Sequence, residues 1–169
     1  KISLPDNLQH IGKNTLKNTA FFNDPENFED GLLYYKNYLL DYSDDFKGSC
    51  NIKEGTKIVA DPMFIVCDTV TSVTSPDNIK GIGDRFFSNC DNLEYVKLPA
   101  GMDTIYAETF RNCKKLKSLI IPEGVTEIDE DAFLNCDSLE YIELPSTIEK
   151  IAYYSIGYRP SSTPGHEDL

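Results

Sequence analysis

Hydrophobic residues recur along most of this 169-residue chain at a fixed interval of 23 residues. Four successive segments carry a phenylalanine, then a cysteine three residues later, then hydrophobic residues three and six residues after the cysteine. Agreement at one period over several spaced positions indicates a solenoid, in which each repeat forms one coil and buries its apolar side against its neighbours. The recurring positions are Phe64, Phe87, Phe110 and Phe133; Cys67, Cys90, Cys113 and Cys136; Val70, Leu93, Leu116 and Leu139; and Val73, Val96, Leu119 and Ile142.

Within one coil, apolar and polar residues alternate over a short stretch. In the segment LEYVKLP, Val96 and Leu98 fall on one face. Tyr95 and Lys97 fall on the other face, which is the pattern of a short strand with one side buried. Pro99 then ends the strand, because proline has no backbone N–H to donate to a neighbouring strand.

Each coil is also expected to contain a second extended piece, around Ile105 and its equivalents, followed by a helical turn. Phe110 and Cys113 are three residues apart, the spacing of side chains on one face of a helical turn. Acidic residues such as Glu108 precede them, where they suit the positive end of a helix dipole. The predicted fold class is therefore an α+β repeat solenoid with 23-residue coils, a parallel sheet on one face and short helical turns on the other.

An insertion at residues 20–47 interrupts the first coil. Its segment LLYYKNYLLDY predicts a hairpin about Lys36 and Asn37, or a looser loop, because lysine is a poor first residue for a two-residue turn. The segment NDPENFEDG is acidic and rich in turn residues. A calcium loop is one interpretation, but the alternating acids of an EF-hand are missing, which favours a solvated loop.

The domain organisation follows the extent of the repeat. We expect a solenoid of about six coils over residues 1–157, with the insertion inside it. Residues 158–169 are rich in proline and serine and form either a tail or the start of a further C-terminal region. Because solenoid ends need capping segments and none is obvious here, we expect the native protein to continue.

The charge balance limits the classes of partner. The chain has 28 acidic and 16 basic residues, a formal net charge of -12, which opposes binding to nucleic acid or to anionic lipid. No apolar run reaches the about 20 residues of a membrane-spanning helix, so we predict no membrane insertion of this segment. The sequence has no P-loop, nucleophile elbow, zinc-protease or dinucleotide motif. We therefore predict a protein that is not an enzyme and that uses no cofactor.

The five cysteines are interpreted as small buried hydrophobic residues. Cys113 lies on the same predicted face as Phe110, and Cys50 occupies a strand position that later coils fill with aliphatic residues. A disulfide between neighbouring coils stays open as an alternative, because adjacent strands are only about 4.8 Å apart. A zinc site needs converging ligands, which a linear ladder does not supply. A catalytic cysteine needs a nearby base, and the only histidines, His10 and His166, lie in the first coil and the tail.

The repeat LEYVKLPAGMDTIYAETFRNCKKL resembles the BspA-type leucine-rich repeat, roughly L-x-x-I-x-L-P-x-x-L-x-x-I-x-x-x-A-F-x-x-C-x-x-L. The match covers about residues 48–152, with a weaker start at residues 2–16. The resemblance implies a curved, right-handed leucine-rich repeat superhelix, extracellular or on the cell surface, in a secreted or anchored bacterial protein. Similar repeats also occur in protists. Adhesion or protein binding is the usual role, and the family has no catalytic motif to carry over.

The outer face of the predicted sheet is the candidate binding surface. Tyr95, Ile120 and Tyr141 come from three adjacent coils and are expected to form one continuous apolar cluster, the kind of surface that marks a protein-binding site. The hypothesis is a non-enzymatic module that binds a host or bacterial surface protein. The alternative is a structural spacer or scaffold joined to another extracellular module. The candidate ligand-binding residues are Tyr95, Lys97, Ser118, Ile120, Tyr141 and Glu143; no catalytic, cofactor-binding or metal-binding residue is predicted.

Overall fold

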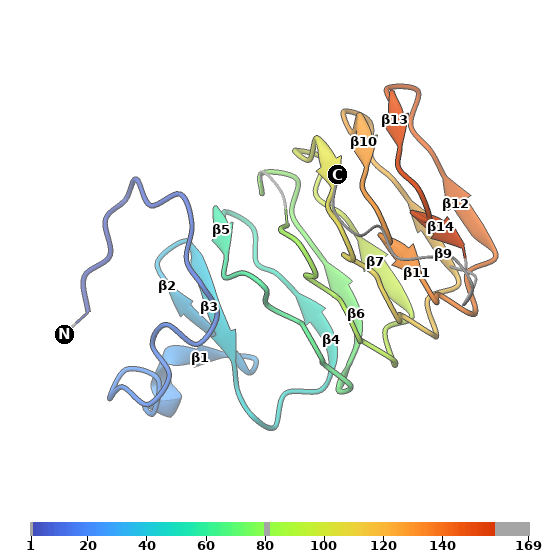
Figure 1. Cartoon of the computed structure of the whole chain (residues 1–169). Coiled ribbons are helices and arrows are strands. Elements are labelled where there is room, and N and C mark those ends of the chain that lie inside the picture. The colour runs from blue at the N-terminus through green and yellow to red at the C-terminus, as the bar shows by residue number, and fades with distance from the viewer. Residues whose placement is uncertain (1, 80–81, 158–169) are drawn as a thin grey trace, which may run out of the picture.

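Stacked coils follow the 23-residue repeat in this computed structural model, which describes residues 2–79 and 82–157. The coils contribute five parallel strands to one side of the stack, in two ladders, β4–β6–β7 and β9–β12 (Figure 1). The predicted sheet is therefore present but divided between β7 and β9. These strands are β4 (Gly48–Asn51), β6 (Val70–Thr74), β7 (Tyr95–Lys97), β9 (Ser118–Ile120) and β12 (Tyr141–Glu143).

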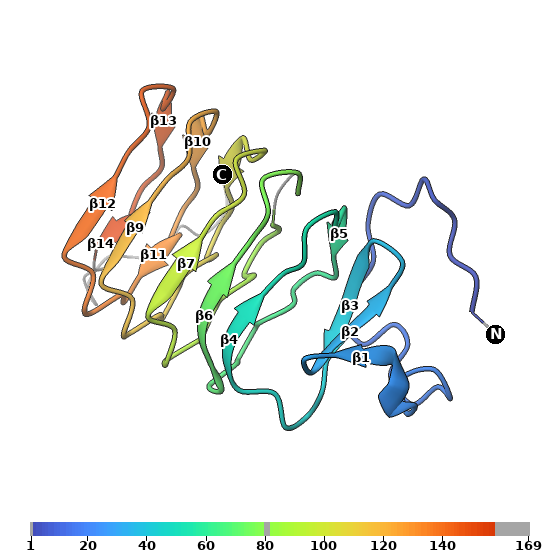
Figure 2. The same ribbon diagram turned by 180° about the vertical axis from the view of Figure 1, so that it is seen from behind.

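Shorter strands line other parts of each coil. A parallel sheet in the order β13–β10–β8 aligns Ile105, Ile128 and Ile151, and β10 and β13 lie at the top of the stack in Figure 2. A further parallel pair joins β11 to β14. The bounds are β8 (Thr104–Ile105), β10 (Glu127–Ile128), β11 (Phe133–Leu134), β13 (Lys150–Ile151) and β14 (Ile156–Gly157).

The insertion forms a hairpin that joins the stack. β2 and β3 are antiparallel, and Tyr35 pairs with Tyr38 across the two-residue connection. Lys36 opens that connection with a φ of 53°, a left-handed conformation that is uncommon for lysine. β3 then pairs in parallel with β5. The elements are the 3₁₀ helix η1 (Pro25–Asn27), β1 (Phe28–Glu29), β2 (Leu32–Tyr35), β3 (Tyr38–Tyr42) and β5 (Ile58–Val59).

The N-terminal segment, blue in Figure 1, runs beside this hairpin. The Tyr38 hydroxyl donates a hydrogen bond to the Pro5 carbonyl at 2.7 Å, and a parallel bridge joins Gly12 to Asp61. In the acidic insertion, the Asp24 side chain accepts the Glu26 N–H and caps η1, so it serves the local backbone.

The core is built on stacked aromatic rings from successive coils. Phe110 is fully buried, and its ring lies 5.3 Å from that of Phe87 and 5.2 Å from that of Phe133, nearly parallel to both. Phe64 extends this stack, and Tyr42 from β3 stacks on Phe64 at 5.7 Å. The inserted hairpin therefore supplies the ring that an additional coil would have provided.

The predicted helical turns, and with them the α+β class, are wrong. Among the described residues the only helix is η1. Around Phe110 the chain makes consecutive turns, because Glu108 and Asn112 both take positive φ values, 54° and 59°. The N–H groups of Phe110 and Asn112 donate to carbonyls of the next coil at 2.8 Å, so hydrogen bonds run between coils instead of along a helix.

Acidic residues at these turns therefore have a different role from the one expected at a helix start. Glu108 accepts from Arg85 of the previous coil at 3.1 Å and from Arg111 at 3.0 Å. These ion pairs are partly exposed and contribute little stability individually.

An asparagine ladder accompanies the left-handed turns. The Asn112 amide donates to Asn89 Oδ1 at 2.6 Å, and the Asn135 amide donates to Asn112 Oδ1 at 2.9 Å. Asparagine tolerates positive φ, which explains its recurrence before the cysteine. Val66 holds the equivalent position one coil earlier with a φ of 54° and a side chain that is 68% exposed. A β-branched residue is strained in this conformation and makes no ladder contact.

The Phe110→Ala variant is expected to lower the free energy of unfolding by about 3–5 kcal/mol, because truncating a buried phenylalanine leaves a cavity. Urea denaturation followed by circular dichroism measures the change. A loss below about 1 kcal/mol would contradict the stacked core, since even modest cavities cost more than that.

The Val66→Asn variant is expected to raise stability by about 1 kcal/mol, because it removes left-handed strain at a β-branched residue. The midpoint of thermal unfolding is the measurement. Val66→Gly is the matched control, which relieves the same strain without offering an amide to Asn89. A lower midpoint for both variants would show that Val66 is not strained.

Candidate functional site

The exposed face of the sheet carries two columns of outward side chains. The β9–β12 register sets Tyr141 opposite Ser118 and Glu143 opposite Ile120. Each of these four side chains is exposed or lies on the exposed face of its strand. The β6–β7 register places Tyr95 in the column of Ser72 and Lys97 in that of Thr74, and the repeat continues these columns to Ser118 and Ile120.

The three apolar candidates are all well exposed: Tyr95 by 54%, Ile120 by 63% and Tyr141 by 55%. They do not all lie in one column of the sheet. Tyr95 and Tyr141 share a column with Ser118 between them, whereas Ile120 occupies the other column. The apolar surface is therefore a triangle across three coils, with Ser118 on the side that joins the two tyrosines.

Polar side chains border this triangle. The Tyr141 hydroxyl donates to Glu143 Oε2 at 3.0 Å, and this hydrogen bond raises the pKa of the Tyr141 phenol. Lys97 forms an ion pair with Asp77 at 3.1 Å. The sheet face thus presents an apolar centre bordered by groups that can pair with polar atoms of a partner.

The stacked cysteines do not form a reactive thiol site. Cys90 Sγ donates to the Phe64 carbonyl at 2.8 Å, and Cys113 Sγ donates to the Phe87 carbonyl at 3.2 Å. Burial raises the pKa of the Cys90 thiol to about 12, so it stays protonated near neutral pH. All five cysteines are free.

Other chemistry is sparse in the described part of the chain. Residues 2–79 and 82–157 contain no group of three or more histidine, cysteine or acidic side chains arranged to hold a metal ion. They also contain no helix long and apolar enough to cross a membrane.

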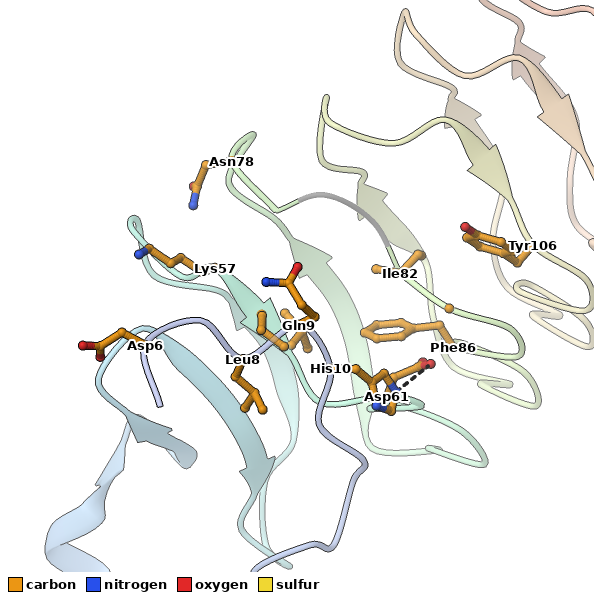
Figure 3. A pocket seen from close by; sticks show the side chains of 13 residues that line it. Asp6, Leu8, Gln9, His10, Lys57, Asp61, Asn78, Ile82, Phe86 and Tyr106 are labelled. Atoms are coloured by element: carbon orange, nitrogen blue, oxygen red, sulfur yellow. Dashed lines mark ion pairs between the residues drawn. The ribbon is translucent and has the colours of Figure 1, made fainter. Parts of the chain in front are cut away.

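A cavity that the sequence did not reveal lies between the N-terminal segment and the first regular coils. Its volume is about 670 Å³, and its wall includes His10, Asp61 and Phe86 (Figure 3). Gly83 is the one sequence feature that could have pointed to it. Later coils have a side chain in this position, such as Tyr106. At Gly83 an added Cβ would clash with Asp61 Oδ2, so the absence of a side chain makes room for the Asp61 carboxylate itself.

The fold defines the class of protein, a β-solenoid of stacked repeats. A model of the BspA type leucine rich repeat region matches residues 36–161 in six copies. The chain belongs to this family, which confirms the resemblance read from the repeat. Comparison with curated protein sequences gives no match.

Solved structures of bacterial leucine-rich repeat proteins share the fold. A leucine-rich cell surface protein from Faecalibacterium prausnitzii is 29% identical with a TM-score of 0.67, covering 80% of this chain and 39% of that chain. A leucine-rich repeat protein from Bacteroides ovatus is 26% identical with a TM-score of 0.51, covering 74% of this chain and 40% of that chain. One from Treponema pallidum is 24% identical with a TM-score of 0.62, covering 78% and 64%. This chain spans less than two thirds of each.

Native protein is expected to expose few thiols to a colour-forming thiol reagent at pH 8, whereas denatured protein should expose all five. Burial and raised thiol pKa values give the reason. Cys136, the least buried, should react first. Two or more disulfides detected by mass spectrometry of unreduced protein would contradict this expectation.

Proposed function

We propose that this solenoid is a non-enzymatic module that binds a partner protein through the exposed face of β7, β9 and β12. The observation that carries the proposal is the triangle of Tyr95, Ile120 and Tyr141. Tyrosine is enriched among residues that dominate binding energy, and clustered apolar side chains on a surface mark interaction sites. Leucine-rich repeat domains generally mediate protein interactions, and such an activity needs no catalytic group.

The inward and outward residues of each strand are under different constraints. Val96 and Leu119 are buried and cannot change with a partner, because they fill the core. Their neighbours Tyr95, Ser118 and Ile120 are exposed and are free to match a ligand. A partner that covers the triangle would bury three large apolar groups, with Lys97 and Glu143 at the border providing polar selectivity.

The proposed setting is the surface of a bacterium, with a host or bacterial surface protein as the partner. BspA-type repeat proteins are typically secreted or surface proteins. The similar protein from Faecalibacterium prausnitzii is itself described as a cell surface protein.

A spacer or scaffold role is the second candidate, favoured by the apolar end of the stack. In the described part of the chain, β12, β13 and β14 pair with an earlier coil only. Leu144, Ile151 and Ile156 are exposed there and suit stacking against further repeats. A scaffold needs these end surfaces but does not need the tyrosines of the sheet face.

The double variant Tyr95→Ala/Tyr141→Ala is expected to abolish capture of a partner from epithelial or bacterial surface extracts. Removing one anchor residue at an interface centre costs at least about 2 kcal/mol of binding energy. Thermal unfolding should stay nearly unchanged, because both side chains are exposed.

Tyr153→Ala is the matched control, since Tyr153 is equally aromatic and 78% exposed but lies outside the sheet face. Equal recovery of one partner by wild type and double variant would place the site elsewhere. The hairpin of residues 32–42 would then be the next region to mutate.

A further inference from the structure

The cavity beside the N-terminal segment contains a carboxylate that is incompletely paired. Asp61 Oδ1 is buried and has no hydrogen-bond partner among the described residues. The side chain as a whole is 25% exposed, and Oδ1 contributes none of that exposure. A buried carboxylate oxygen without a partner is costly, so this carboxylate gains from any cation that reaches Oδ2.

The described groups around Asp61 do not neutralise it. His10 Nε2 lies 3.9 Å from Asp61 Oδ2, beyond hydrogen-bond distance, and is charged only when protonated. Asp84 adds a second negative charge nearby. Desolvation raises the pKa of Asp61, while His10 and a backbone hydrogen bond from Gly83 lower it.

The basic residues of this region serve a different carboxylate. Lys57 lies on the cavity wall, but its charge acts on Asp6, which Lys36 also contacts at 2.7 Å. Asp6 and Lys57 lie at one end of the cavity, and His10 and Asp61 lie at the other (Figure 3). The cavity is therefore locally negative at the Asp61 end.

The wall of the cavity next to Asp61 is apolar. Leu8, Ile82 and Phe86 contribute to it, and the ring of Tyr106 stands at its side (Figure 3). A ligand that fits this arrangement has one positive head and a hydrocarbon stem.

We propose that this cavity binds a lysine side chain of a partner protein, with the ammonium group on Asp61 Oδ2 and the methylene stem along Leu8 and Ile82. Because Oδ1 is buried, a ligand can reach at most one Asp61 oxygen, which suits the compact charge of an ammonium. An arginine fork binds best to two accessible carboxylate oxygens, so lysine is preferred. This site lies outside the sheet face and does not depend on the function proposed for that face.

The test is an NMR titration of isotope-labelled protein with Nα-acetyl-lysine methylamide. Wild type is expected to bind it with shifts at Gly83 and Asp61, and to bind Nα-acetyl-norleucine methylamide roughly tenfold or more weakly, since norleucine lacks the charge. The arginine analogue should bind more weakly than the lysine analogue. Free lysine should bind no more tightly than the blocked form, which distinguishes a protein side chain from the free amino acid.

The Asp61→Asn variant should reduce lysine-analogue affinity roughly tenfold or more, because it keeps the shape of the side chain and removes its charge. Asp77→Asn is the matched control, an exposed carboxylate outside the cavity whose loss should leave the affinity unchanged. Equal binding of the lysine and norleucine analogues by wild type would overturn the proposal without any variant. So would tighter binding of arginine, or an affinity unaffected by Asp61→Asn.

Lys80 lies outside the described residues and calls for one more control. If wild type fails to bind the lysine analogue while Lys80→Ala binds it, the cavity takes a lysine of this chain. That result would overturn a site for a partner's lysine. Equal binding by wild type and Lys80→Ala supports the proposal.

Discussion

Backbone hydrogen bonds between successive coils are the constraint on which the rest of the structure depends. The N–H of Phe87 donates to Thr109 and that of Phe110 to Ala132, each 22 residues further along the chain. An unpaired buried backbone group costs about 1–3 kcal/mol, so successive coils must keep the same length. Equivalent side chains then lie above one another, which produces the phenylalanine stack, the asparagine ladder and the outward columns of the sheet.

The same register explains which parts of the fold could be predicted. The inward positions of each strand follow from alternation alone, and Phe110 and Cys113 are buried as expected. The prediction of a helical turn was wrong, because a spacing of three residues between Phe110 and Cys113 fits both a helical turn and a pair of overlapping β-turns. The residue before the cysteine distinguishes them: asparagine at positions such as 89 and 112 favours the left-handed conformation that ends a helix.

The candidate surface was only partly predictable. Exposure of Tyr95, Ile120 and Tyr141 follows from strand alternation, and the 23-residue period already sets Ile120 in the column of Lys97 and Glu143. The division of the sheet between β7 and β9 does not follow from that period. The cavity at Asp61 had almost no local signal. It arises where the N-terminal segment, which repeats only weakly, meets a regular coil, and a period read from the sequence cannot say how such a segment docks.

The sheet face and the cavity at Asp61 would hold a partner through different forces, so their contributions to its affinity can be distinguished. Burying Tyr95, Ile120 and Tyr141 is driven by removal of apolar surface from water, which salt at moderate concentration changes little. Attraction to Asp61 is electrostatic at long range, and ions screen it over about 8 Å at physiological ionic strength. A partner held by the sheet face alone therefore keeps its affinity as salt rises. A partner that also places a lysine in the cavity loses, as salt rises, the part of its affinity and of its association rate that the charge of Asp61 supplies.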